Sequence, residues 1–108
     1  MKFKEYQDMA KTTAIYPEQY KTNYPILGLA GEAGELANKY KKVLRDDSGI
    51  LSEEKRKALI DELGDCLWYL SAIASDLGAD LEQVATDNIT KLLSRKGRGV
   101  IQGSGDNR

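Results

Sequence analysis

Apolar residues recur at intervals of three and four along four stretches of the chain, the spacing that places them on one face of an α-helix. These stretches predict helices over residues 3–13, 25–45, 53–77 and 81–95. No stretch alternates apolar and polar residues as a half-buried β-strand does. The pattern therefore predicts an all-α fold, a domain like a four-helix bundle in which short connections join consecutive helices.

Turn and capping residues separate the predicted helices. Pro25 suits the first position of the second helix, and Ser52 suits the N-cap of the third. Gly78 suits the left-handed position that follows a helix, and Asp80 with Gln83 resembles a capping box for the fourth helix. These boundaries agree with the apolar spacing, which strengthens the helical prediction.

Two segments lie outside the regular pattern. Residues 15–24 hold three tyrosines close to two prolines, Pro17 and Pro25, and we interpret them as a connection with one helical turn. Residues 96–108 are rich in glycine and arginine, a composition typical of a flexible tail. We therefore expect a helical domain over residues 1–95 and a flexible C-terminal tail over residues 96–108. Such a tail is equally suited to wrap over an anion and to remain disordered.

Composition narrows the class of protein. The 16 basic and 17 acidic residues give a net charge of −1, so no global positive field exists to hold a nucleic acid polymer. No apolar run approaches the roughly 20 residues that span a membrane, and no signal-peptide pattern opens the chain. We therefore expect a cytoplasmic protein. With one cysteine and no histidine, the chain must use carboxylates, amines, guanidinium groups, hydroxyls or an oxygen-bound metal for any chemistry.

Acidic residues stand three positions apart in three places, the pairs Glu5/Asp8, Glu32/Glu35 and Glu62/Asp65. Composition alone predicts roughly three such pairs, so the interpretation depends on where each pair lies. Glu32/Glu35 and Glu62/Asp65 border the apolar faces of the second and third helices. If both faces meet in one core, four carboxylates converge at its edge, where their mutual repulsion favours a bound cation.

Oxygen ligands suit a hard divalent cation such as Mg²⁺, which shares its coordination shell with water and with substrate phosphates. Hydrolysis of a phosphoanhydride uses a metal in this way. The alternative is that these carboxylates are solvated and paired with lysines such as Lys39. Spacing and position alone favour neither interpretation.

Other side chains border the same predicted site. Asn88, Lys91 and Arg95 share one stripe of the fourth helix, where the cations could grip phosphate oxygens, although without the acidic pairs ordinary exposed charge explains them better. Tyr69 lies on the side of the third helix that carries its acidic pair, so it either stacks on a base or simply packs. Trp68 points away from that side, where a subunit contact is the better interpretation.

The most specific sequence in the chain is Gly28-Leu29-Ala30-Gly31-Glu32-Ala33-Gly34-Glu35-Leu36, followed later by Glu62-Leu63-Gly64-Asp65. With Asn88-x-x-Lys91-Leu92, the basic Arg95 and the tail sequence Gly103-Ser104-Gly105-Asp106, it resembles the MazG-like nucleotide pyrophosphohydrolases of the all-α NTP pyrophosphatase superfamily. The resemblance runs from about residue 27 to the end of the chain.

The resemblance implies that the protein cleaves a nucleoside triphosphate between its α- and β-phosphates, which yields a monophosphate and pyrophosphate and cleans the nucleotide pool. It implies Mg²⁺ as the cofactor, with Mn²⁺ as a substitute, bound by Glu32, Glu35, Glu62 and Asp65. Glu35 is the first choice for orienting the attacking water. Substrate phosphates or sugar would contact Lys39, Asn88, Lys91 and Arg95. Relatives form homodimers or homotetramers with active sites near subunit contacts, which suits a chain with a small core of its own.

Two other functions are consistent with parts of the pattern. A non-catalytic helical oligomerisation module would use the same acids to bind a structural cation or a basic partner. A di-iron carboxylate bundle is a weak alternative, because such sites use a Glu-x-x-His pair and the chain has no histidine. The enzyme, unlike the module, should hydrolyse nucleoside triphosphates with Mg²⁺ and should lose this activity in folded Glu35→Gln and Asp65→Asn variants.

Overall fold

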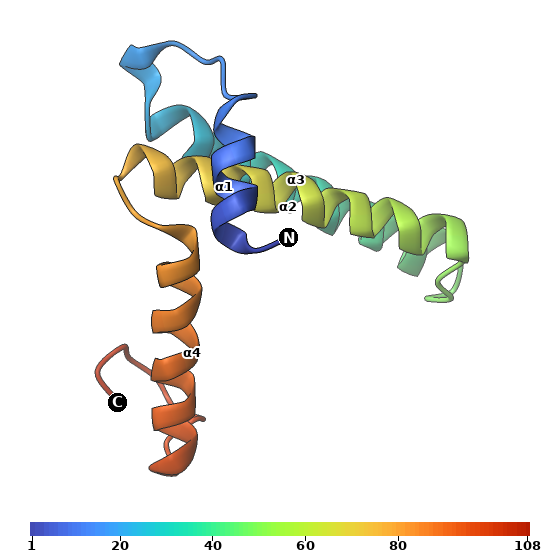
Figure 1. Cartoon of the computed structure of the whole chain (residues 1–108). Helices are drawn as coiled ribbons and strands as arrows, with labels where there is room; N and C mark the ends of the chain where they lie inside the picture. Colours follow the sequence, from blue (N-terminus) through green and yellow to red (C-terminus); the bar gives the residue numbers. More distant parts are fainter.

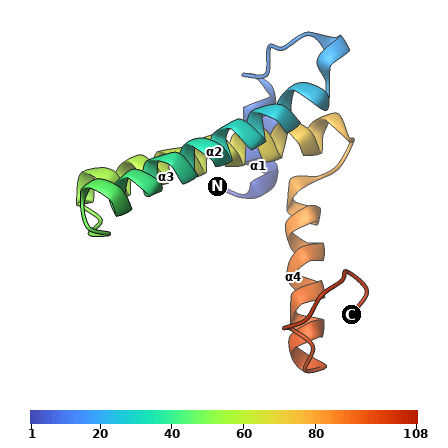
Figure 2. The same cartoon turned by 180° about the vertical axis from the view of Figure 1, so that it is seen from behind.

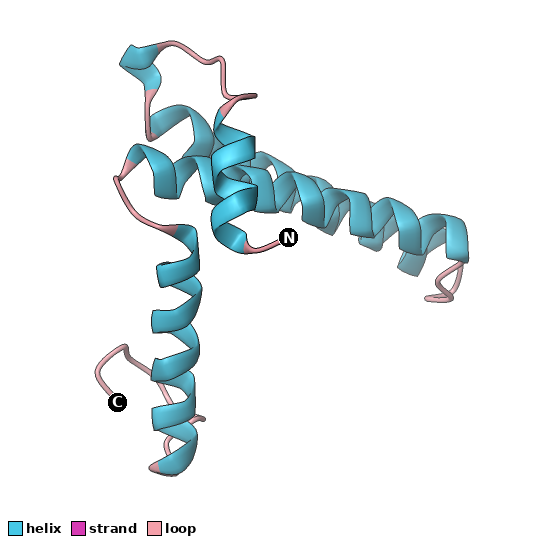
Figure 3. Ribbon diagram, in the orientation of Figure 1, coloured by secondary structure: helices cyan, strands magenta, loops and turns pink.

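A computed structural model describes all 108 residues and contains helices without strands (Figure 3). The elements are α1 (Phe3–Lys11), the 3₁₀ turn η1 (Glu18–Tyr20), α2 (Asn23–Asp46), α3 (Glu53–Asp76) and α4 (Leu81–Gly97). The predicted all-α fold is therefore confirmed, and the two long helices begin and end close to their predicted boundaries. The predicted helical turn in the tyrosine-rich connection is η1.

Helices α2 and α3 lie side by side and antiparallel, and α1 crosses them (Figures 1 and 2). Ser48 and Gly49 adopt positive φ angles of 55° and 77°, which reverse the chain between the two helices. Ser52 then caps α3, where its hydroxyl accepts a hydrogen bond of 3.2 Å from the N–H of Lys55. Because the loop is short, a residue of α2 faces the residue of α3 that lies at a similar distance from the loop.

Helix α4 turns away from this pair, and most of its length stands clear of the other helices (Figure 1). The elbow is built by Gly78, with a φ of 70°, and by Asp80, whose carboxylate caps α4 through the N–H of Glu82. Gln7 of α1 fixes both sides of the elbow. Its amide donates to the carbonyl of Ala79 at 2.9 Å, and its oxygen accepts from the N–H of Leu81 at 2.8 Å. The four helices therefore do not close into a bundle within one chain.

The core of the single chain is correspondingly small. Only four apolar side chains other than Pro25 are buried: Val43, Ala72, Ala74 and Leu81. Leu63, Leu70 and Leu77, which the apolar spacing of α3 predicts to be buried, are 54%, 45% and 65% exposed. That prediction is wrong for the single chain, because α4 turns away from the pair over most of its length and leaves these side chains exposed. No helix combines the length and apolar composition that a bilayer-spanning segment needs.

Candidate functional site

Three carboxylates meet where α2 packs on α3. Glu32 of α2 and Glu62 and Asp65 of α3 each offer an oxygen, and these oxygens all lie within 4.8 Å of one another. Antiparallel packing brings them together, since Glu32 faces the turn of α3 that carries the other two. We call these three residues the acidic cluster. Three of the four acids predicted to converge do so.

Lys39 supplies the nearest positive charge to the acidic cluster. Its ammonium group lies 2.7 Å from Oε1 of Glu62. Glu62 is only 7% exposed, and its second oxygen, Oε2, is buried without a hydrogen-bond partner. A buried carboxylate oxygen without a partner is costly, so Glu62 brings an unused acceptor to the cluster. The donor set consists of oxygens alone, which fits a hard divalent cation.

The protonation of the acidic cluster is uneven. The hydrogen bond to Glu62 raises the pKa of Glu32, and burial and the charges of Glu62, Asp65 and Glu35 raise it further. The Lys39 ammonium chiefly, together with the hydrogen bond from Glu32, lowers the pKa of Glu62. Glu32 therefore takes up a proton more readily than Glu62, whose negative charge the lysine stabilises.

Glu35 stands outside the acidic cluster. It lies one helical turn beyond Glu32 on α2, and its side chain is exposed. Its charge still reaches the site, because it contributes to the raised pKa values of Glu32 and Lys39. Three of the four predicted acids therefore lie close together, and Glu35 lies beside them.

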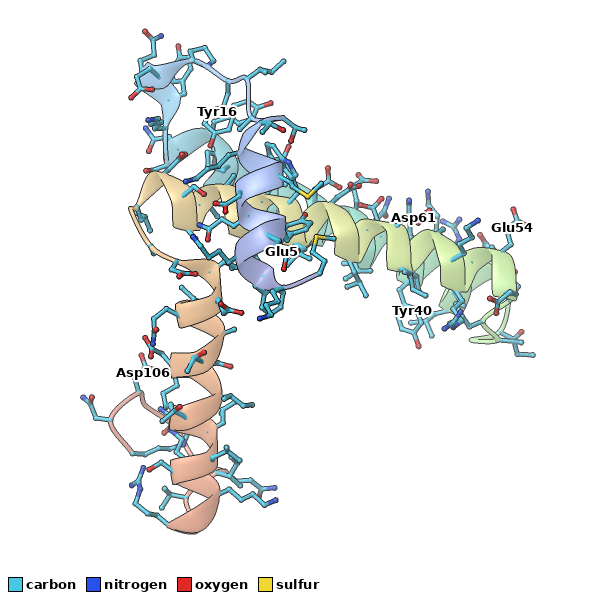
Figure 4. The ribbon with its side chains drawn as sticks, viewed as in Figure 1. Glu5, Tyr16, Tyr40, Glu54, Asp61 and Asp106 are labelled. Atoms are coloured by element: carbon cyan, nitrogen blue, oxygen red, sulfur yellow. The ribbon has the colours of Figure 1, made fainter.

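The predicted substrate residues of α4 are not brought to the acidic cluster within one chain. Asn88 and Lys91 are exposed. Most of α4 stands clear of α2 and α3 (Figure 1). Arg95 is only 4% exposed, and its guanidinium donates to the carbonyl of Asp106 at 2.8 Å. Figure 4 labels Asp106 in the C-terminal segment beside α4. The elbow after α3 is the physical reason for this separation.

Aromatic side chains form a hollow of about 330 Å³ where the start of α2 passes the part of α3 that carries Trp68 and Tyr69. We call it the aromatic hollow. It is lined by Thr13, Ile15, Tyr16, Pro17, Tyr24, Trp68 and Tyr69. Tyr69 stands one helical turn after Asp65 on α3, so the hollow adjoins the acidic cluster. Burial raises the pKa of Tyr69, and the charges of Tyr24, Glu32 and Asp65 raise it further. Trp68, expected to point away, lines this hollow and donates to the hydroxyl of Thr13 at 2.7 Å.

The close packing beside the hollow explains one glycine of the α2 sequence. A Cβ atom on Gly28 would lie 2.1 Å from Cε1 of Tyr69, whereas Cβ atoms on Gly31 and Gly34 would meet nothing within 4 Å. Gly28 is therefore required for α2 to pass the tyrosine ring. Sequence reasoning missed Tyr16 and Tyr24 as lining residues, and the available signal was that each directly precedes a proline in a tyrosine-rich segment.

The fold and the site define an all-α protein with a carboxylate cluster suited to a divalent cation. The profile of the MazG nucleotide pyrophosphohydrolase domain matches residues 20–99. The chain therefore belongs to the MazG family. It is 50% identical over 109 aligned positions to the Gene 37 protein of Mycobacterium phage L5, a match that covers 95% of this chain and 96% of that protein. No solved structure matches.

Family membership supports a nucleotide pyrophosphohydrolase activity, a hydrolysis of acid anhydrides with a nucleotide as substrate. The family typically uses divalent cations, and the acidic cluster is a possible place for one.

Proposed function

We propose that this protein is a Mg²⁺-dependent nucleoside triphosphate pyrophosphohydrolase that cleans the nucleotide pool. Water adds to phosphorus, the bridging P–O bond between the α- and β-phosphates breaks, and the products are a nucleoside monophosphate and pyrophosphate. Mn²⁺ is the expected substitute. The observation that carries the proposal is the acidic cluster in a member of the MazG family, with the unpartnered Oε2 of Glu62 inside it.

Glu32, Glu62 and Asp65 would hold the cation, and Glu35, which borders them, is the fourth ligand in the proposal. When bound, the cation supplies positive charge that neutralises the phosphates and favours attack by water. Glu35 is also the residue proposed to orient that water, because an exposed carboxylate beside the acidic cluster is free to accept its proton. Lys39 would exchange its contact with Glu62 for a phosphate oxygen of the substrate.

The aromatic hollow is the proposed place for the base. Its volume of about 330 Å³ and its tyrosine and tryptophan rings suit a planar heterocycle, and it adjoins the acidic cluster on the side away from Lys39. Stacking on such rings accepts different bases, so the hollow alone does not select one base. The order of base hollow, acidic cluster and lysine follows the order of base and phosphates in a nucleotide.

A homodimer or homotetramer completes the proposal. Leu63, Leu70 and Leu77 form an exposed apolar stripe, and burying it needs a partner that a single chain lacks. Asn88, Lys91 and Arg95 are proposed to contact phosphates or sugar once a second copy packs on α4. Arg95 would have to leave the carbonyl of Asp106 to do so.

The test is hydrolysis by the purified protein with a panel of NTPs and dNTPs, with Mg²⁺ and after its removal by a chelator. Pyrophosphate release should require the cation. Asp65→Asn should lose cation binding and hydrolysis together, whereas Glu35→Gln should lower kcat by about a hundredfold or more. Glu54→Gln, which changes an exposed acid at the start of α3, is the matched control. Cation binding without hydrolysis of any substrate would instead support the non-catalytic module.

A further inference from the structure

Asp76, the last residue of α3, holds a distant part of the chain with a single oxygen. Its Oδ2 accepts a hydrogen bond of 2.7 Å from the hydroxyl of Tyr16 and one of 2.8 Å from the N–H of Thr22. These donors lie 60 and 54 positions earlier in the sequence. The carboxylate therefore fastens both the middle and the end of the connection between α1 and α2 to the end of α3.

The contact with Thr22 fixes where α2 begins. Thr22 precedes the first residue of α2 and has a φ of 68°, a left-handed conformation that a β-branched residue rarely adopts. Its side chain makes no capping hydrogen bond. The hydrogen bond from its N–H to Asp76 stabilises this unusual backbone, which sets the direction of the first turn of α2.

The contact with Tyr16 fixes one wall of the aromatic hollow. The Tyr16 ring stacks on Tyr24, with centroids 4.9 Å apart and an angle of 20° between the planes. Figure 4 labels Tyr16 in the connection between α1 and α2. Asp76 thus anchors the hydroxyl end of Tyr16 and the turn that carries Tyr24, and both rings line the hollow. The remaining anchor of this connection is the hydrogen bond from Trp68 to Thr13.

We propose that Asp76 is a positioning residue for base recognition, because it holds the stacked pair of Tyr16 and Tyr24 against the aromatic hollow. This inference rests on the proposed function, in which the hollow receives the base. Asp76 itself does not line the hollow and lies outside the acidic cluster. Its effect should therefore be confined to the part of the substrate that carries the base.

The test measures two affinities, one for a ligand with a base and one for a ligand without. Binding of a nucleoside monophosphate is followed by the emission of Trp68, the only tryptophan of the chain, and binding of Mg²⁺ is followed by calorimetry. In Asp76→Ala the Kd of the monophosphate should rise about tenfold, within the range that stacking on aromatic rings contributes. The Kd of Mg²⁺ should stay within about twofold, as expected for a separate site.

Conservative variants separate positioning from folding. Asp76→Asn should restore most of the monophosphate affinity, since an amide oxygen has two lone pairs and can accept both hydrogen bonds. If Asp76→Ala does not fold, Tyr16→Phe, which lacks only the hydroxyl group, serves instead. Its Kd for the monophosphate should rise about threefold, a loss near the net contribution of one hydrogen bond. Tyr20→Phe, in the same connection and without a recorded side-chain partner, should not weaken it.

The outcomes distinguish the two proposals. The inference alone is overturned if the wild-type protein hydrolyses NTPs and Asp76→Ala binds the monophosphate with unchanged affinity. If Asp76→Ala does not fold, unchanged affinity in Tyr16→Phe has the same meaning. An equal loss of monophosphate and Mg²⁺ affinity also overturns it, because that pattern indicates general disruption. A wild-type protein that binds no nucleotide and hydrolyses none overturns the proposed function and the inference with it.

Discussion

Lys39 and Glu62 form an ion pair across the α2–α3 interface, with 2.7 Å between the ammonium nitrogen and Oε1 of the most buried acid of the acidic cluster. The side chain of Glu62 is much less exposed than that of Lys39, at 9% against 41%. A cation belonging to the chain therefore neutralises the carboxylate that a divalent cation would also use. The lysine and the metal compete for Glu62, and the phosphates of a substrate offer the lysine another partner.

The competition between Lys39 and the metal predicts that one substitution strengthens Mg²⁺ binding and weakens hydrolysis. Lys39→Gln should bind Mg²⁺ more tightly than the wild type, because the metal no longer displaces an ammonium group. The same variant should lose about ten- to a hundredfold in kcat/KM, which is the value of a hydrogen bond to a charged group. Calorimetric titration with Mg²⁺ and initial rates measure the two effects. Lys41→Gln, an exposed lysine of the same helix, is the control; weaker Mg²⁺ binding in Lys39→Gln would contradict the competition.

The raised pKa of Glu32 predicts how cation binding depends on pH. Bound cation needs deprotonated carboxylates, so Mg²⁺ affinity should fall as the pH falls through the raised pKa of Glu32. In the cation-free protein this group favours folding below its raised pKa, and that stability is lost as the pH rises through it. Glu62 has the opposite sign: its lowered pKa gives stability that is lost only at lower pH.

Calorimetric titration with Mg²⁺ at several pH values checks this prediction, and Glu32→Gln supplies the comparison. The variant should bind Mg²⁺ more weakly and should lose the part of the pH dependence that lies above the ordinary glutamate range. An unchanged pH profile in Glu32→Gln would mean that another group holds the proton.

The contact between Gly28 and Tyr69 predicts different outcomes for two glycines of the same helix. Gly28→Ala should destabilise the protein by about 1–3 kcal/mol, the usual cost of overpacking, because its Cβ would lie 2.1 Å from the tyrosine ring. Gly31→Ala meets nothing within 4 Å and should stabilise α2 by roughly 0.5–1 kcal/mol. Urea denaturation measures both. Similar changes in the two variants would show that the tyrosine ring moves aside without cost.

The hydrogen bonds of Gln7 predict that the elbow before α4 depends on a residue of α1. Gln7→Met removes the partners of the Ala79 carbonyl and the Leu81 N–H. The free energy of unfolding should fall by about 2–4 kcal/mol, since an unpaired buried polar group costs about 1–3 kcal/mol. Denaturation curves measure this loss. Gln19→Met, on the exposed turn η1, is the control and should change stability little; equal losses in both variants would contradict the role of Gln7.

Sequence patterns predicted the parts of the structure that depend on neighbours within a helix or across a short loop. Glu32 meets Glu62 and Asp65 because two long amphipathic helices joined by a tight turn must pack antiparallel. The direction of α4 was not predictable, because it depends on the φ of Gly78 and on hydrogen bonds between Gln7 and the backbone of Ala79 and Leu81, more than 70 positions away in the sequence. Helical periodicity places residues on a face and does not say what covers that face.

The same limit explains the uneven outcome at the site. Periodicity placed Glu35 near Glu32, yet one further helical turn leaves it exposed beside the acidic cluster. Asn88, Lys91 and Arg95 share a stripe of α4 as predicted. The direction of α4 decides whether that stripe faces the acidic cluster, and periodicity does not fix this direction. Whether these residues contact substrate stays a prediction.

The most direct test of the central claim is the identity of the products formed from a nucleoside triphosphate and Mg²⁺, resolved by ³¹P NMR. Nucleoside monophosphate and pyrophosphate in equal amounts, formed by the wild type and not by Asp65→Asn, is the predicted result. Nucleoside diphosphate and orthophosphate would contradict the proposed cleavage between the α- and β-phosphates.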